Sequence, residues 1–238
     1  MSKRFKTAVY WTLMLTVLIW GVFLVDLLPG TNFSFWYGLH TREIAGLPGV
    51  FASPFLHGSW SHLLSNTPPL MSLLGLMIFF YPRLWPRALT MLWIGTGLLV
   101  WLLGRPVTHI GASGVVYALA AFLGFSGFFR RDMRAIVVSL LVLFYYGSMV
   151  VGVLPGQEGI SWESHLLGLV MGIITAVLLK GELEDHEIAA INEKATRYKN
   201  DAPEEHFLEA DAFTATKDEK AQRAFWEKIQ EASRRREL

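Results

Sequence analysis

Cysteine is absent from the 238 residues, and charged residues make up only 17% of them. The absence of cysteine excludes a small secreted domain held together by disulfides. Average soluble domains contain about 25% charged residues, so the low charge argues against an ordinary soluble core. The lysines and arginines are scattered between apolar runs rather than gathered on one face, which excludes a nucleic-acid binder. Hydrophobic residues make up 53% of the chain, and the mean hydropathy is +0.38.

The net charge of +1 conceals two parts of opposite sign. Residues 1–180 contain eleven Lys/Arg and five Asp/Glu, a net +6, whereas residues 181–238 contain ten and fifteen, a net −5. We therefore predict a membrane-embedded domain over residues 1–180 and a charged cytoplasmic C-terminal tail over residues 181–238.

Apolar runs of about 20 residues, each long enough to cross a bilayer as a helix, recur in the first part. The first could be read as a signal peptide, but its length and the lack of a small-residue cleavage site favour a retained anchor. The predicted fold is an all-α integral membrane protein, a six-transmembrane-helix bundle with a helical tail. The predicted spans are residues 7–28, 62–81, 88–104, 113–129, 135–154 and 162–179.

The basic residues alternate across this map. Nine Lys/Arg lie on one side of the predicted spans and only Arg42 and Arg105 on the other. Because cytoplasmic loops carry the excess of Lys/Arg, both termini are predicted to be cytoplasmic. The nine are Lys3, Arg4, Lys6, Arg83, Arg87, Arg130, Arg131, Arg134 and Lys180.

The tail is expected to be a separate soluble unit. Thr216 followed by Glu219 predicts a capping box that opens a helix. This helix would carry Phe225, Trp226 and Ile229 and close on the arginines at 234–236. It is either a solvated helix or one that docks onto the inner membrane face.

Polar residues inside membrane spans are expensive and therefore suggest function. His62 and Asn66 are four residues apart, so they share one face near the outer end of the second span. Pro68 and Pro69 follow and remove two backbone donors, which predicts a disturbed helix. The alternative is a pair of interfacial polar residues that hold helices together.

Ser113 opens the fourth span directly after Gly111-Ala112. The glycine allows a tight turn, and the N–H groups of a helix N-terminus suit a developing oxyanion. Tyr117 lies one turn along on the serine's face. A serine at this place can equally be a simple helix cap.

His165 lies near the outer end of the sixth span, followed by Gly168 and Gly172, which let a neighbouring helix approach closely. A lone histidine in an apolar helix is often a packing residue. If the fourth and sixth helices are partners, however, His165 could accept the Ser113 proton. Spacing places no carboxylate beside the pair; the acidic candidates on that side are Asp26, Glu158 and Glu163.

These residues resemble the rhomboid family of intramembrane serine proteases. Three signatures carry the resemblance over about residues 7–180, in the expected order on the expected spans. They are His57-x4-His62-x3-Asn66, Gly111-Ala112-Ser113-Gly114, and His165-x-x-Gly168-x-x-x-Gly172.

The resemblance implies a serine endopeptidase that cleaves transmembrane segments of single-pass membrane proteins near the outer face, in a bacterial-type inner membrane. Ser113 would be the nucleophile and His165 the general base, with an acyl-enzyme intermediate. No metal or cofactor is implied, and the sequence predicts no oligomeric state. The remaining roles are an oxyanion hole of His62, Asn66 and the Ser113 N–H, a Tyr117 that orients His165, a structural His57, and a Gly111 that permits the turn.

Two positions depart from the family pattern. Leu47-Pro48-Gly49-Val50 stands in the outer loop where many relatives carry a Trp-Arg pair, which bears on loop stability. Ser164 precedes the base where alanine is common, and we expect an added hydrogen bond with little effect.

Two other functions remain open on sequence grounds. One is a non-catalytic rhomboid-like pseudoprotease that binds membrane-protein clients, which the intact Ser113 and His165 disfavour. The other is a small transporter, which the lack of paired inverted halves disfavours.

Overall fold

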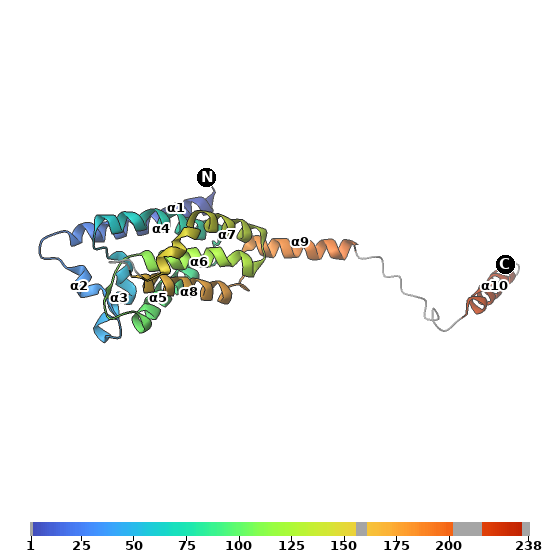
Figure 1. Cartoon of the computed structure of the whole chain (residues 1–238). Coiled ribbons are helices and arrows are strands. Elements are labelled where there is room, and N and C mark those ends of the chain that lie inside the picture. The colour runs from blue at the N-terminus through green and yellow to red at the C-terminus, as the bar shows by residue number, and fades with distance from the viewer. Residues whose placement is uncertain (1, 156–160, 202–215, 235–238) are drawn as a thin grey trace. The chain divides into compact units, whose positions relative to one another are not determined.

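The computed structural model describes residues 2–155, 161–201 and 216–234 (Figure 1). The chain divides into two compact units, residues 1–189 and 190–238. The elements, in order, are α1 (Lys3–Asp26), α2 (Phe33–Tyr37), β1 (Leu39–His40), η1 (Ile44–Gly46), α3 (Pro48–Ala52), η2 (Ser53–Phe55), α4 (Trp60–Phe80), α5 (Trp85–Leu103), β2 (Thr108–His109), α6 (Ser113–Arg130), α7 (Met133–Tyr146), η3 (Gly147–Val153), α8 (Trp162–Leu178), α9 (Asp185–Asp201) and α10 (Lys217–Arg234).

The predicted all-helical membrane bundle is confirmed. Among the described residues, five helices are long and apolar enough to span a bilayer: α1, α4, α5, α6, and α7 continued by η3. The sixth predicted span is α8, a shorter apolar helix of 17 residues. The fifth predicted span is not one regular helix, because the α-helix ends at Tyr146 and a 3-10 helix continues to Val153.

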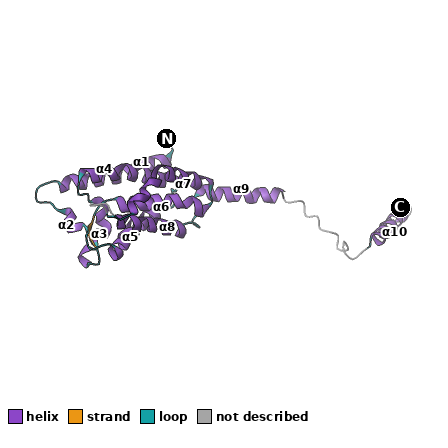
Figure 2. Cartoon of the chain, in the orientation of Figure 1, coloured by secondary structure: helices purple, strands orange, loops and turns teal. Residues whose placement is uncertain are grey.

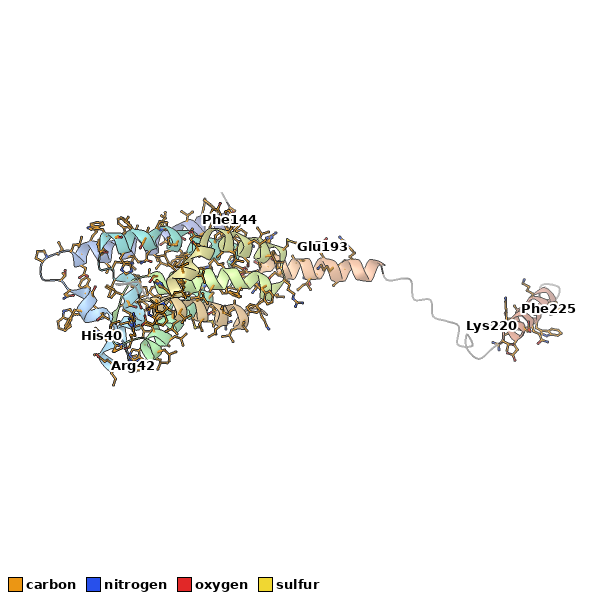
Figure 3. The ribbon with its side chains drawn as sticks, in the orientation of Figure 1. His40, Arg42, Phe144, Glu193, Lys220 and Phe225 are labelled. Carbon is orange, nitrogen blue, oxygen red and sulfur yellow. The ribbon has the colours of Figure 1, made fainter. Side chains whose placement is uncertain are left out.

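The central helix of the bundle is α6. Figure 1 shows it between α4 and α7 on one side and α5 and α8 on the other, and it packs against all four. Most of its side chains are buried, including Phe122 and Leu123. The outer helices instead expose large apolar side chains, such as Phe144 on α7, 81% exposed (Figure 3). Such a surface suits a lipid environment, where apolar side chains need no cover.

The contact between α6 and α8 is the most extensive in the bundle, and glycines make it possible. A Cβ at Gly168 would lie 2.1 Å from the Gly114 carbonyl oxygen, and one at Gly172 would lie 2.4 Å from that of Ala118. The two backbones therefore meet at distances that only glycine allows. The expected close approach of another helix to these glycines is confirmed, and the partner is the helix that begins at Ser113.

α4 continues through Pro68 and Pro69 without a break. Side chains form hydrogen bonds around this stretch, since the Thr67 hydroxyl donates to the Leu63 carbonyl and accepts from the Trp20 indole of α1. The two prolines therefore do not interrupt the helix, and polar side chains form hydrogen bonds beside them.

The loop between α1 and α4 is structured and fastened to the segment that precedes Ser113. β1 pairs antiparallel with β2, with Leu39 opposite His109 (strands orange in Figure 2). Arg42, which adopts a left-handed conformation with φ 58°, donates from its backbone to the Trp101 carbonyl and from its side chain to that of Gly104. The loop therefore fixes the chain just before the nucleophile candidate.

The sequence suggested that a separate tail begins directly after Lys180. In the structure, residues 181–189 still belong to the first compact unit. The Glu184 side chain, 1% exposed, accepts hydrogen bonds from the backbone N–H groups of Arg83 and Leu84 in the turn between α4 and α5. Charged residues that the composition assigned to a soluble tail therefore cap the end of the bundle that holds the turn between α4 and α5.

A buried ion pair joins the same segment to the end of α6. The guanidinium of Arg130 pairs with the Glu187 carboxylate, and their side chains are only 2% and 7% exposed. Arg130 also donates to the Leu179 and Glu182 carbonyls, so most of its donors are used. Removing one partner of such a pair leaves an uncompensated buried charge and costs about 3–5 kcal/mol.

The predicted capping box of the second unit is confirmed. The Thr216 hydroxyl accepts from the Glu219 N–H, and the Glu219 carboxylate accepts from the Thr216 N–H. Phe225 and Trp226 on α10 are exposed. The side chain of Ile229 and residues 235 and 236, where the arginine cluster was expected to close the helix, lie outside the described part.

We predict that ending the chain at residue 201 leaves the stability of the bundle unchanged, whereas ending it after Lys180 lowers it. The shorter chain lacks Glu184 and Glu187, so the Arg130 guanidinium stays buried without its counter-ion. Thermal unfolding of the purified proteins in detergent measures the difference.

Two point variants serve as matched controls. Glu187→Gln should lower Tm, whereas Glu193→Gln (labelled in Figure 3) should not, because the Glu193–Arg197 pair is exposed. An equal Tm for both truncated chains would show that residues 181–189 add nothing to the bundle.

Candidate active site

A cavity of about 1280 Å³ opens between α4, α6, α8 and η3. Five of the predicted site residues line it: His62, Asn66, Ser113, Tyr117 and His165. The structure therefore brings together side chains from three helices that the sequence could place only on separate spans. The other two, His57 and Gly111, lie behind its wall and contact the lining residues.

Ser113 is the first residue of α6, and the preceding turn is built around Gly111. Gly111 has φ +107°, and its N–H donates to the Ser53 carbonyl at 2.9 Å. A Cβ there would lie 2.5 Å from the Cε1 and Nε2 atoms of His62, so only glycine lets this imidazole pack against the turn. The Ser113 hydroxyl is half-buried and has no hydrogen-bond partner among the residues that the structure describes.

Hydrogen bonding determines which nitrogen of His165 carries the proton. Nδ1 lies 2.9 Å from the Gly152 carbonyl oxygen, which can only accept. Nδ1 therefore carries the proton, and in the neutral imidazole Nε2 is the free acceptor. The ring stacks on Tyr117 with centroids 4.2 Å apart and an interplanar angle of 8°, and the Tyr117 hydroxyl donates to the Met149 carbonyl at 2.8 Å.

The group that fixes the tautomer of His165 was not predicted from the sequence, which offered only carboxylates as candidates. Glu163, however, pairs with Arg105, and Asp26 accepts from the Phe33 N–H. Glu158 lies outside the described residues. The orienting group is a backbone carbonyl of η3, which no side-chain pattern could reveal. Gly152 is required at this place, since a Cβ would lie 2.0 Å from the Tyr117 hydroxyl.

His57 holds Asn66 in place beside the turn before Ser113. Its Nε2 accepts from the Asn66 side-chain amide at 3.3 Å and from the Ala112 N–H at 3.4 Å. Asn66 is 6% exposed, and its amide carries two N–H groups, of which this bond uses one. The other N–H has no partner among the described residues, and Asn66 lines the cavity.

The neutral state of His57 is favoured by its surroundings. Burial and, after it, the neighbouring His62 lower its pKa from 6.5 to about 4, against the opposing effect of the Phe55 backbone. At neutral pH the ring therefore carries one proton, and because the Ala112 N–H can only donate, that proton is on Nδ1 and Nε2 accepts.

Among the described residues, one group has the composition of a metal site, near the start of α7: Asp132, His186 and Glu187. Each already has a partner, since Asp132 caps α7 and contacts His186, while Glu187 pairs with Arg130. The adjacent guanidinium disfavours a second cation. The cluster is an ion-pair network that closes the end of the bundle.

Comparison with known families agrees with this geometry. The Rhomboid domain matches residues 45–182, more than half of the chain. The chain belongs to the rhomboid family. The resemblance inferred from the three signatures is thus confirmed, and the protein is a multi-pass membrane protein of a family of intramembrane proteases that act on membrane-protein substrates within the bilayer.

Mycobacterial proteins are among the similar sequences. An uncharacterized protein of Mycobacterium tuberculosis and one of Mycobacterium bovis are each 39% identical over 189 residues, covering 75% of this chain and 78% of the relative. An uncharacterized protein of Mycobacterium leprae is 35% identical over 175 residues, covering 67% of this chain and 66% of the relative.

The lowered pKa of His57 predicts a specific pH dependence of stability in this rhomboid protein. Between pH 6.5 and about 4 the unfolded chain binds a proton at this residue and the folded chain does not, so the free energy of unfolding falls as the pH falls. His57→Gln retains an acceptor for Asn66 and Ala112 but does not titrate. We expect the Tm of this variant in detergent to fall less than that of the parent between pH 6.5 and 4. Identical slopes would rule out a neutral buried His57.

Proposed function

We propose that this rhomboid protein is an intramembrane serine endopeptidase in which Ser113 is the nucleophile and His165 the general base. The observation that carries the proposal is the tautomer of His165. Its Nδ1–H is held by the Gly152 carbonyl, so its Nε2 is an acceptor in the cavity that Ser113 also lines. A base needs this arrangement to take a hydroxyl proton.

The first half of the reaction forms an acyl-enzyme. The Ser113 oxygen attacks the carbonyl carbon of the scissile peptide bond while its proton passes to His165 Nε2. The C–N bond then breaks, and the imidazolium returns the proton to the leaving amine. In the second half, water attacks the ester and gives its proton to His165, which passes it back to the Ser113 oxygen as the acid product leaves.

The oxyanion that forms in both halves would be bound by the free N–H of the Asn66 amide, by His62, and by the Ser113 N–H at the start of α6. Asn66 is pre-oriented by His57, and the Gly111 turn keeps the His62 ring beside the nucleophile. Donors fixed in advance do not have to reorganise in the transition state, and removing one costs about 10²–10³ in kcat.

No carboxylate is needed in this mechanism. The Gly152 carbonyl keeps the imidazole in the correct tautomer, and the Tyr117 ring keeps it in the correct plane. The structure shows no direct hydrogen bond between Ser113 and His165, and such catalytic bonds commonly tighten only in the complex with substrate.

The substrates we propose are transmembrane segments of single-pass proteins. The excess of Lys/Arg on the side of Arg83, Arg130 and Lys180 supports a bacterial-type inner membrane with both termini cytoplasmic and the cavity toward the outer face. Cleavage would then occur near the outer end of the substrate helix. All six apolar helices, including the short α8, would be spans.

We expect Ser113→Ala and His165→Ala to abolish cleavage of a single-pass reporter in detergent or proteoliposomes. Ser126→Ala is the matched control, because Ser126 is on the same helix, is 1% exposed, and donates to the Phe122 carbonyl of α6 rather than lining the cavity. It should cleave at the rate of the parent.

Cleavage by Ser113→Ala at the parent rate would refute the mechanism. A folded parent that binds the reporter but neither cleaves it nor reacts with a fluorophosphonate would favour a pseudoprotease instead.

A further inference from the structure

A second polar cluster adjoins the candidate active-site cavity, which two of its members, His109 and Ser161, line. The polar atoms of His109, Ser161 and Ser164 are in mutual contact: His109 Nδ1 lies 2.7 Å from Ser161 Oγ and 3.3 Å from Ser164 Oγ, and the two hydroxyl oxygens are 2.7 Å apart. His109 is 3% exposed and Ser164 is 9% exposed. We call these three residues the His109 ring.

The direction of the hydrogen bonds follows from one carbonyl. His109 Nε2 lies 3.1 Å from the Arg105 carbonyl oxygen, which can only accept, so Nε2 carries the proton and Nδ1 is the acceptor. The Ser161 hydroxyl, at 2.7 Å against 3.3 Å for that of Ser164, therefore donates to Nδ1. That leaves Ser161 Oγ to accept from the Ser164 hydroxyl, and every donor points the same way, from Ser164 to the Arg105 carbonyl.

The His109 ring joins the two chain segments that carry the catalytic pair. His109 ends β2, four residues before Ser113, and Ser164 directly precedes His165. The segments also touch near the ring, since a Cβ at Gly114 would lie 3.3 Å from the Ser164 carbonyl oxygen. Ser161 caps α8 by accepting from the Ser164 N–H, so the ring acts on the first turn of that helix.

We propose that the His109 ring is a positioning device of the protease site: it holds the first turn of α8 against the strand that leads to Ser113, and so sets the direction of the His165 imidazole. This inference rests on the proposed function. The hydrogen bond expected from the Ser164 hydroxyl is present. Because this bond is part of the His109 ring, we expect it to affect the rate of cleavage, whereas the sequence alone suggested little effect.

Burial and the neighbouring charges keep His109 neutral at neutral pH. Burial lowers the pKa of His109, and Arg105 and His40 lower it further; the hydrogen bond to the Arg105 carbonyl and the Glu163 carboxylate oppose the shift. Glu163 is itself paired with the Arg105 side chain. A neutral His109 is what the acceptor role of Nδ1 requires.

Two substitutions at Ser161, whose new side chains have the same shape as each other, distinguish the role of the ring from that of the helix cap. Asparagine and aspartate both supply an oxygen that caps α8, but only asparagine also supplies an N–H that can donate to His109 Nδ1. A carboxylate is acceptor-only and would favour the protonated imidazole, which reverses the bond.

The test compares kcat, KM and Tm of the full-length parent, Ser161→Asn and Ser161→Asp on a single-pass reporter. We expect Ser161→Asn to retain kcat within about twofold and Ser161→Asp to lose about tenfold or more with little change in KM, because small misplacements of a catalytic group cost rate. Both should keep the Tm of the parent.

Equal kcat values for the two variants would overturn the positioning role while leaving the protease assignment intact. If Ser161→Asp does not fold, Ser164→Ala decides, because it keeps the cap and removes one donor of the ring: an unchanged kcat overturns the role, and a severalfold loss supports it. A parent without Ser113-dependent cleavage would instead refute the proposed function itself.

Discussion

The structure depends on the contact between α6 and α8, where two backbones meet with no side chain between them. Gly168 lies against the carbonyl of Gly114, the residue after Ser113, and Gly172 lies against that of Ala118 one turn further. Within a membrane, helices gain little from burying apolar surface against each other, so close backbone packing supplies much of their association. The same contact brings the turn carrying Ser113 to the turn carrying His165. Stability and chemistry thus share one interface.

Backbone groups then hold the reactive side chains. Two histidines of the site are fixed as the same tautomer, with the proton on Nδ1: His165 donates from Nδ1 to a carbonyl, and His57 accepts at Nε2 from an N–H and an amide. A membrane-embedded site gains from this arrangement, because a carboxylate would bring a further charge into a poorly solvated place. The proposed dyad replaces the third member of a catalytic triad with the carbonyl of Gly152.

Much of this could be predicted from the sequence, because a bilayer separates residue types strictly. The helical spans follow from apolar length, and Ser113, His165 and Asn66 stand out since few polar residues interrupt those spans. The Gly152 carbonyl was not predictable, because every residue has one. Nor was the burial of Glu184 and Glu187, because they stand in a charged stretch that is typical of a solvated tail. The partner of Glu184 is a turn about 100 residues away, and that of Glu187 is an arginine 57 residues away. The His109 ring likewise joins segments that are 52 residues apart.

The most direct test of the central claim is the rate at which a fluorophosphonate labels Ser113, read by peptide mass mapping of purified protein. Gly168→Ala inserts a methyl group into the contact between α6 and α8, whereas Gly124→Ala adds one where the nearest atom is 4.0 Å away. We expect the parent and Gly124→Ala to be labelled at Ser113 equally fast. Gly168→Ala, still folded, should be labelled at about one tenth of that rate or more slowly. Labelling of Gly168→Ala at the rate of the parent, or labelling at another residue, would contradict it.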